Sequence, residues 1–353
     1  MFSSLPFSNM FLLTLGGGTL FSVSSLHWLG IWAGLEINLM GFLPMLVLPK
    51  GSIQSESAVK YFVIQALGSS FLIFGSLMTY SISYTWEINL TSSLLTNNMG
   101  LLLIISGLCL KLGFWPFHYW LPSVMAGLSW MSCLLLASWQ KIAPLYLMIC
   151  LMENGNHFLI IFMFCLISGG SSLMGGLGGI NQTQIRPLLA YSSIGHLGWM
   201  LFALMHMEWV MKVYFFIYLI LSICIFMMLW YIDMKNMVNL EKLNKYEFSA
   251  MGIIFMLLSL GGLPPLLGFV SKWLVMVVSF QGPYFPLMSL FISGSLMSLF
   301  YYLSLLFSVI LGEFKKYNLT SLSSSESYLL SWIFIINFVS IIFVLNSDIF
   351  NVI

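Results

Sequence analysis

The most constraining feature of the sequence is a succession of long apolar segments with almost no charge inside them. Each is close to the length of about 20 residues that an α-helix needs to cross a bilayer. Charged residues make up 7% of the 353 residues, whereas soluble domains carry about 25%. The sequence therefore predicts an all-α polytopic membrane protein. The eleven predicted spans are 5–26, 28–49, 58–83, 99–116, 123–149, 157–178, 187–206, 210–232, 249–275, 286–311 and 328–346.

Composition also argues against several other classes of protein. The apolar runs are too long for the strands of a membrane barrel and lack their alternating pattern. The net charge of +1, without a long run of one sign, gives no basis for a nucleic-acid partner. None of the five cysteines forms a C-x-x-C pair, so disulfide, zinc and iron–sulfur sites are not expected. The cysteines are Cys109, Cys133, Cys150, Cys165 and Cys224.

The basic residues in the connections and at the ends of the spans lie mainly on one side of the predicted membrane. Only Lys212 follows an odd-numbered span, whereas eight basic residues follow even-numbered ones. By the positive-inside rule, the N-terminus and the even-numbered connections face the cytoplasm or its organellar equivalent. With an odd number of spans, the C-terminus faces the opposite side. The eight residues are Lys50, Lys60, Arg186, Lys235, Lys242, Lys245, Lys315 and Lys316.

Two spans contain glycine and proline residues that should interrupt a helix. If spans one to five and six to ten form two five-helix units, each interrupted segment is the fourth helix of its unit. Because five is odd, the second unit would be inverted, and paired broken helices in inverted repeats indicate a transport site. Two unrelated proline kinks are the alternative. The interrupting residues are Pro116 and Pro122 in 108–122, and Gly261, Gly262, Pro264 and Pro265 in 258–273.

Four ionisable residues lie within or at the break of these spans: Glu36, Lys111, Lys141 and Lys272. Such a group is costly at bilayer depth and is a functional candidate by default. Lys111 and Lys272 can alternatively extend to the membrane interface, as can Lys141 with more difficulty. Glu36 can alternatively form a purely structural ion pair.

One carboxylate and three amines favour protons over organic substrates as the cargo. Burial disfavours the charged form of a lysine, so a lysine inside a membrane can load and release a proton. His196 lies inside span seven, where a relay role is plausible, whereas His118 follows the first break and can instead cap or pack. No set of histidines has the spacing of a metal site. Other polar candidates are Ser138, Gln140, Ser192 and Ser193.

The glycine-rich segment 169–184, GGSSLMGGLGGINQTQ, follows an apolar run and lacks the G-x-G-x-x-G pattern of a nucleotide-binding loop. We interpret it as a site of close helix packing that ends in a polar turn.

Five motifs and their order along the chain resemble those of the NADH dehydrogenase subunit 2 family, the antiporter-like membrane subunits of respiratory complex I. The segment WAGLEINLMGFLPM matches the one that carries the family's membrane glutamate. The other motifs are KLGFWPFHYWLPSVMAGLSW, WQKIAP, NQTQIRPLLAYSSIGHLGWM and GGLPPLLGFVSKW.

The resemblance implies a protein of the mitochondrial inner membrane, with its N-terminus in the matrix and its C-terminus in the intermembrane space. It implies two inverted five-helix repeats, at 1–150 and 151–312, each with a broken fourth helix. A linker and a C-terminal transmembrane helix occupy 313–353. The partners it implies are other membrane subunits of complex I, including neighbouring antiporter-like subunits, together with lipids and protons.

The resemblance also implies roles for single residues. Glu36 corresponds to the glutamate that pairs with Lys111, Lys141 to the central lysine, and Lys272 to the lysine on the exit side. NADH, flavin, iron–sulfur clusters and ubiquinone would bind other subunits, with no cofactor or metal on this chain. Ser123 is a departure, because many relatives have a glutamate there.

Three functions are compatible with these patterns. The first is a proton-translocating subunit of complex I, coupled to NADH oxidation and quinone reduction in other subunits. The alternative is a stand-alone cation/proton antiporter, which should show a second intramembrane carboxylate besides Glu36. A membrane scaffold that conducts nothing would need neither the deep lysines nor the broken helices.

Overall fold

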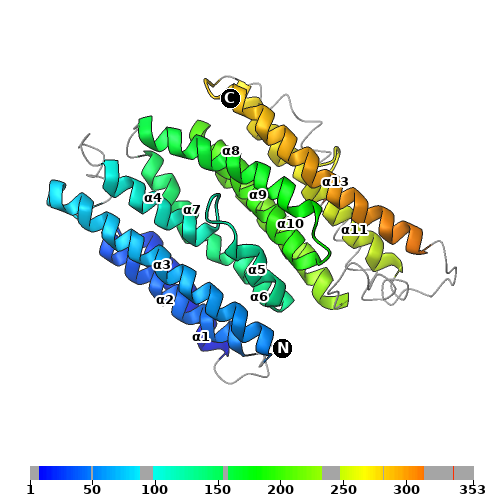
Figure 1. Ribbon diagram of the computed structural model, residues 1–353, viewed down its shortest axis with the longest axis horizontal. Coiled ribbons are helices and arrows are strands. Elements are labelled where there is room, and N and C mark those ends of the chain that lie inside the picture. The colour runs from blue at the N-terminus through cyan, green and yellow to red at the C-terminus, as the bar shows by residue number, and fades with distance from the viewer. Residues whose placement is uncertain are drawn as a thin grey trace. The chain divides into compact units, whose positions relative to one another are not determined.

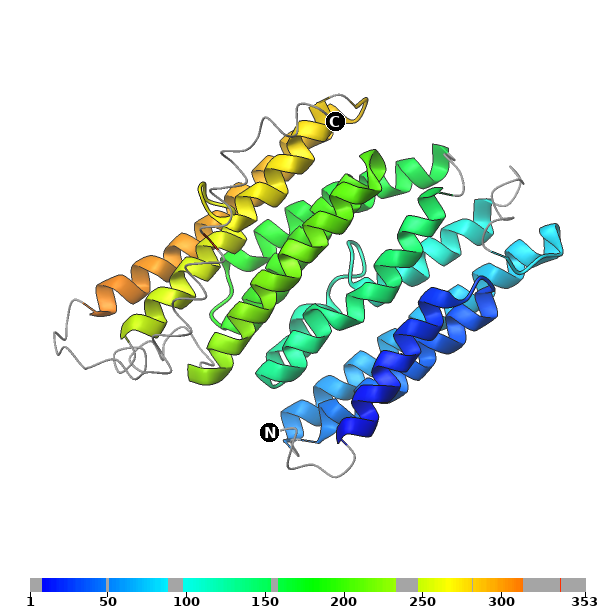
Figure 2. The ribbon, with the colours of Figure 1, turned by 180° about the vertical axis from the view of Figure 1, so that it is seen from behind.

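The computed structural model describes residues 8–48, 51–87, 98–153, 158–232, 247–280 and 282–313, together with Asn337 (Figures 1 and 2). Within these ranges the secondary structure is helical, apart from an isolated bridge between His27 and Glu87. Seven helical segments are long and apolar enough to cross a membrane. The predicted all-α membrane fold is therefore confirmed for the described part of the chain.

The chain divides into two compact units, Met1–Ser168 and Gly169–Ile353. In the first unit, α1 packs on α2, and α3 packs on α2, α4 and α5. The helices α4 and α7 are also in contact, as are α6 and α7. The bounds are α1 Ser8–Ser24, α2 Trp28–Val47, α3 Ser52–Ser83, α4 Asn98–Leu112, α5 Trp120–Gly127, α6 Trp130–Ala137 and α7 Trp139–Glu153.

The helix α8, Phe158–Ile180, begins in the first unit and ends in the second. In the second unit, α10 packs on α9, α11 and α12, and α13 packs on α9 and α11. The bounds are α9 Ile185–His206, α10 Glu208–Ile232, α11 Glu247–Gly261, α12 Leu267–Phe280, the short 3-10 helix η4 Phe285–Leu287, and α13 Met288–Glu313.

Each of the first ten predicted spans overlaps one helix or several consecutive helices. The fifth, predicted at 123–149, begins later, because 120–127 forms the separate helix α5 and the next helical segment starts at Trp130. The eleventh predicted span, 328–346, and the polar connection 233–246 lie outside the described residues, as does most of the predicted C-terminal region 313–353.

Glycines allow several helices to approach closely. A Cβ atom on Gly107 of α4 would lie 2.8 Å from the carbonyl oxygen of Gly68 on α3. On α8, a Cβ atom on Gly175 would lie 2.5 Å from the Gly195 nitrogen of α9, and one on Gly176 would lie 2.7 Å from the Gly294 oxygen of α13. The helix packing predicted for the glycine-rich segment is thus confirmed.

Large apolar side chains are exposed on the helices of both units, as expected where lipid is the solvent. Examples are Leu13, Leu20, Ile53, Phe216 and Phe300. Some polar side chains are buried in each unit, and several of them lie beside the two interrupted helices.

Candidate functional site

The first interruption follows α4. Gly113 adopts a left-handed φ of +78°, which costs glycine little and other residues more. The N–H groups of Gly113 and Phe114 both donate to the carbonyl oxygen of Cys109, at 2.9 and 3.1 Å. A glycine with positive φ thus ends the helix, with the 6→1 bond from Phe114 that is typical of a Schellman motif. The chain becomes helical again only at Trp120, where α5 begins.

Side chains bind two carbonyl groups that this helix end leaves free. The indole Nε1 of Trp120 donates to the carbonyl oxygen of Leu110 at 3.1 Å, and Nε2 of Gln65 donates to that of Lys111 at 3.3 Å. Backbone that is not helical is tolerated at membrane depth only where such partners exist. The first break is therefore a satisfied, built feature of the fold.

The second interruption has the same local architecture. Gly262 has a φ of +82°, and the N–H groups of Gly262 and Leu263 donate to the carbonyl oxygen of Leu258 at 3.1 and 3.3 Å. The helix α11 therefore ends at Gly261, and α12 begins at Leu267. In both breaks a glycine with positive φ directly follows the last helical residue.

A lysine binds the free carbonyl end of α11. Nζ of Lys272 on α12 donates to the carbonyl oxygen of Gly261 at 2.7 Å, and the Lys272 side chain is buried. The two halves of the broken helix also touch closely, because a Cβ atom on Gly268 would lie only 1.7 Å from the Ser259 oxygen. The lysine thus faces the protein interior, where the break presents a carbonyl group.

The prediction that Pro122 interrupts a helix was wrong. Pro122 is the third residue of α5, where backbone N–H groups have no intrahelical partner and a proline sacrifices nothing. Pro116 does lie in the non-helical segment, but α4 has already ended at Leu112, before Gly113. A glycine helix end, rather than the prolines, defines the first break.

A small cavity in the first unit brings two predicted site residues together. Lys111 and Lys141, which are 7% and 2% exposed, both line it. Its volume, about 20 Å³ of space for the centre of a water molecule, is enough to hold about one water. The other polar residues that line it are Asn38, Tyr61, Gln65, Trp120 and Gln140.

Lys141 lies in the first turn of α7, directly after the irregular turn at Ser138 that separates α6 from α7. The helix α6 ends at Ala137, and the N–H of Lys141 bonds to the carbonyl oxygen of Ser138 at 3.3 Å, three residues back instead of four. Pro144 within α7 has no N–H with which to bind the carbonyl of Gln140. This arrangement places a lysine beside locally weakened helix backbone, next to the cavity.

Glu36 is half-buried on α2 and does not line this cavity. Its Oε1 atom is buried and has no hydrogen-bond partner among the described residues. In the same part of the chain, no direct ion pair joins Glu36 to Lys111, although the two side chains are close enough to interact electrostatically. The predicted pairing of Glu36 with Lys111 is therefore not a direct ion pair in this structure, and a functional coupling of the two residues remains a prediction.

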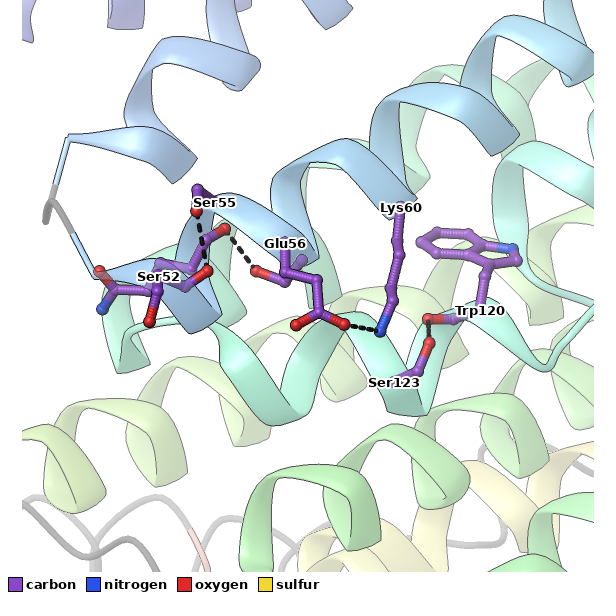
Figure 3. Close-up of polar contacts among 8 residues, drawn as sticks. Ser52, Ser55, Glu56, Lys60, Trp120 and Ser123 are labelled. Atoms are coloured by element: carbon purple, nitrogen blue, oxygen red, sulfur yellow. Dashed lines mark hydrogen bonds and ion pairs between the residues drawn. The ribbon is translucent and has the colours of Figure 1, made fainter.

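The direct ion pairs in the described ranges lie at the surface instead. Lys60 and Glu56, both exposed on α3, are 2.6 Å apart (Figure 3), and Lys212 and Glu208 are 3.4 Å apart on α10. Exposed pairs of this kind contribute little to stability. Figure 3 also shows Ser123, whose hydroxyl donates to the carbonyl oxygen of Trp120 within α5 at 2.9 Å.

A second cavity of similar size lies in the second unit and is lined by Lys272 and His196. His196 is 6% exposed, and its Nδ1 atom is 2.9 Å from the hydroxyl oxygen of Tyr214. The cavity thus joins the broken helix to α9 and α13. The remaining polar residues that line it are Ser172, Ser192, Trp199, Ser295, Ser298, Tyr301 and Tyr302.

His118 lies in neither cavity. It is buried within the non-helical segment of the first break, with its ring against that of Tyr119 at a centroid distance of 4.2 Å. Its Nδ1 atom has no hydrogen-bond partner in the described ranges. The structure thus places His118 with the backbone of the break, apart from the lysines that line the cavity.

The chain is similar in sequence to a known protein family and to several of its members. The family described as NADH:quinone oxidoreductase/Mrp antiporter, TM, matches residues 25–298. NADH-ubiquinone oxidoreductase chain 2 of Anopheles gambiae is 41% identical over 340 residues, which cover 95% of each chain. The same subunit of Lemur catta is 37% identical, over 89% of this chain and 88% of the relative.

The chain belongs to the NADH-ubiquinone oxidoreductase chain 2 family. This confirms the resemblance drawn from the motifs. Among solved structures, a chain of respiratory complex I from Thermus thermophilus has a TM-score of 0.80 at 23% identity, covering 94% of this chain and 77% of that one. A chain of an archaeal membrane-bound sulfane sulfur reductase has a TM-score of 0.82 at 18% identity, covering 95% and 72%. At these identities the likeness concerns the fold alone.

Several polar residues around the cavities of this chain 2 family member were not among the predicted site residues. Asn38 follows Glu36 closely in LEINLMG, but it was not among the ionisable and polar residues selected from the apolar spans. Tyr214, Tyr301 and Tyr302 are buried, and tyrosines are too common in membrane helices for sequence to single them out. A search for amides inside apolar runs would have found Asn38.

Proposed function

We propose that the chain is a proton-translocating membrane subunit of NADH:ubiquinone oxidoreductase, respiratory complex I. NADH oxidation and quinone reduction take place in other subunits and drive it. The observation that carries the proposal is a buried lysine at each broken helix, beside a polar cavity, in a chain of the chain 2 family. The chain itself performs no redox chemistry.

The relay consists of Glu36, Lys111, Lys141, Lys272 and His196, with water between them. A lysine removed from water can exist neutral or charged near neutral pH, so it can accept a proton and pass it on. Each cavity has space for about one water molecule. Moving one charge across 100 mV costs about 2.3 kcal/mol, so small changes in hydration can decide the direction of transfer. His118 remains the weakest candidate, because it lies outside both cavities.

The fold in the membrane has eleven transmembrane helices, arranged as two inverted five-helix repeats, 1–150 and 151–312. A linker and a final transmembrane helix follow at 313–353. Supporting this layout, the glycines at 113 and 262 end the two broken helices in the same way. The bias of basic residues supports an N-terminus in the mitochondrial matrix and a C-terminus in the intermembrane space.

The flavin, the iron–sulfur clusters and the NADH and ubiquinone sites are on other subunits. The spacing of the cysteines supports this, because it does not fit an iron–sulfur centre. The partners of the chain are the other membrane subunits of the complex, including neighbouring antiporter-like subunits, and lipids that cover its exposed apolar faces.

Isolation of the chain from native inner membranes in mild detergent tests the proposal. The chain should co-purify with NADH:ubiquinone oxidoreductase activity in one large complex. Reconstitution of that complex into vesicles should give proton uptake that depends on NADH. A chain that purifies alone and exchanges cations for protons without NADH would contradict the proposal and support a stand-alone antiporter.

A further inference from the structure

A pair of amide side chains joins α2 to α7 beside the first cavity. Nδ2 of Asn38 donates to Oε1 of Gln140 at 2.9 Å, and Nε2 of Gln140 donates to Oδ1 of Asn38 at 3.2 Å. Both residues line the cavity that also contains Lys111 and Lys141. The two amides are 102 residues apart in the sequence, so the fold has brought them together.

The packing of α2 against α7 does not by itself require this pair of amides. Asn38 is buried on the inner face of α2, between Leu35 and Phe42, where a leucine would need no hydrogen-bond partner. Side-chain hydrogen bonds between helices inside a membrane contribute little to association. An amide that loses its partner there is costly. The pair adds little to helix association, and an unpaired amide at this place would be costly. We therefore look for its role in the cavity that contains Lys141.

The backbone next to Gln140 is irregular, so a hydrogen bond from the Gln140 side chain to another helix can stabilise it. The turn at Ser138 separates α6 from α7, and the N–H of Lys141 reaches back only to the Ser138 carbonyl. Pro144 cannot donate to the carbonyl of Gln140. The first turn of α7 therefore lacks part of its regular hydrogen bonding. A side-chain bond from Gln140 to Asn38 on α2 fixes the position of this turn.

We propose that Asn38 and Gln140 are positioning residues that hold Lys141 in the cavity it shares with Lys111. This inference rests on the proposed proton transfer through Lys141. The amides do not titrate, and each keeps one further N–H and one further lone pair outside the pair. They can therefore support Lys141 in both its charged and neutral forms, whereas a carboxylate would favour the charged form.

The decisive variants are a double replacement and an exchange in the assembled complex. Asn38→Leu with Gln140→Leu removes both amides and leaves neither unpaired, so assembly should persist. Proton pumping should fall at least about tenfold, because a shift of about 1 Å in a reacting group can cost on the order of 100-fold in rate. The pH profile of pumping should also move, since the surroundings of Lys141 change. Asn38→Gln with Gln140→Asn restores the pair at equal total length and should recover most of the pumping.

Gln182→Leu is the matched control, because it removes an amide that follows α8, donates to the carbonyl oxygen of Gly178 on that helix and lines neither cavity. It should pump like the unchanged protein. If the double leucine variant assembles and keeps both the rate and the pH profile of the unchanged protein, the pair is structural and the inference is wrong. Failure of the exchange variant to recover pumping would also overturn it.

Lys141→Met in the same assay separates this inference from the proposed function. Loss of pumping in Lys141→Met, combined with normal pumping in the double leucine variant, refutes only the positioning role. Normal pumping in Lys141→Met refutes the relay role on which the inference rests.

Discussion

The Nζ atom of Lys272 donates a 2.7 Å hydrogen bond to the carbonyl oxygen of Gly261, the last residue of α11. The carbonyl end of a helix carries partial negative charge and favours a nearby cation. Lys272 is therefore both a candidate proton carrier and the side chain that completes the broken helix. Its protonation and the stability of the break are expected to be linked.

Replacing Lys272 with methionine should affect both roles. Lys272→Met leaves a buried carbonyl without its donor, which costs about 1–3 kcal/mol, and removes a titrating group. We expect a lower temperature of thermal dissociation of the complex and a sharp loss of proton pumping. Lys212→Met is the control, since Lys212 is exposed and paired only at the surface. Pumping by Lys272→Met equal to that of the unchanged complex would contradict the relay role of Lys272.

The two glycines that end the broken helices should tolerate no side chain. Gly113→Ala and Gly262→Ala each force a residue with a Cβ atom into the left-handed region, at a cost of roughly 1–2 kcal/mol. At Gly262 the new Cβ atom would also lie 3.0 Å from Nζ of Lys272. Thermal dissociation should occur at lower temperature in both variants, and pumping should fall in Gly262→Ala.

Gly17→Ala provides the comparison for these glycine variants. Gly17 lies within α1, and a Cβ atom there would meet no other atom within 4 Å. Alanine should be neutral or stabilising at this position, by up to about 1 kcal/mol. Equal effects at positions 17, 113 and 262 would show that the helix ends have no special requirement for glycine.

Glu36 and Lys111 should be energetically coupled even without a direct ion pair. Neutralising either residue leaves the other charge unmatched in the membrane, so removing both should be milder than the sum of the single effects. A double-mutant cycle on pumping rates, with Glu36→Gln and Lys111→Met, should give a coupling of about 0.5–3 kcal/mol. Simple additivity would argue that the two residues act independently.

The hydroxyl of Tyr214 should matter if His196 carries protons. Tyr214→Phe removes the group 2.9 Å from Nδ1 of His196 while keeping the aromatic ring. A net loss of about 0.5–1.5 kcal/mol is expected for one such bond, which would slow proton pumping severalfold. Tyr80→Phe, on α3 against Trp86, is the control. Unchanged pumping in Tyr214→Phe would count against a relay through His196.

Hydropathy and charge were sufficient to predict where the first ten apolar spans form helices, because a membrane span needs a long apolar run that sequence displays directly. They did not predict that the fifth span is divided into α5, α6 and α7. The breaks were predicted at the right places but for partly wrong reasons. Pro122 lies in the first turn of α5, and the positive φ at Gly113 was not foreseen. Whether a proline breaks a helix or begins one depends on where the preceding helix has ended.

The composition of the cavities could be predicted only in part. The buried lysines stand out because charge is rare in these spans, whereas Asn38 and Tyr214 are uncharged and were not selected. That Asn38 bonds to Gln140, across 102 positions, depends on the packing of α2 and α7. The pattern of residues along the sequence does not show that these two side chains are in contact.

Proton pumping by the assembled complex with Lys141→Met tests the central claim most directly. Complex I carrying this variant should assemble but pump protons far more slowly into vesicles when NADH is supplied. Lys141→Arg should fail as well, because a guanidinium group keeps its proton. Pumping at the rate of the unchanged complex, in a preparation shown to contain the variant subunit, would contradict the account.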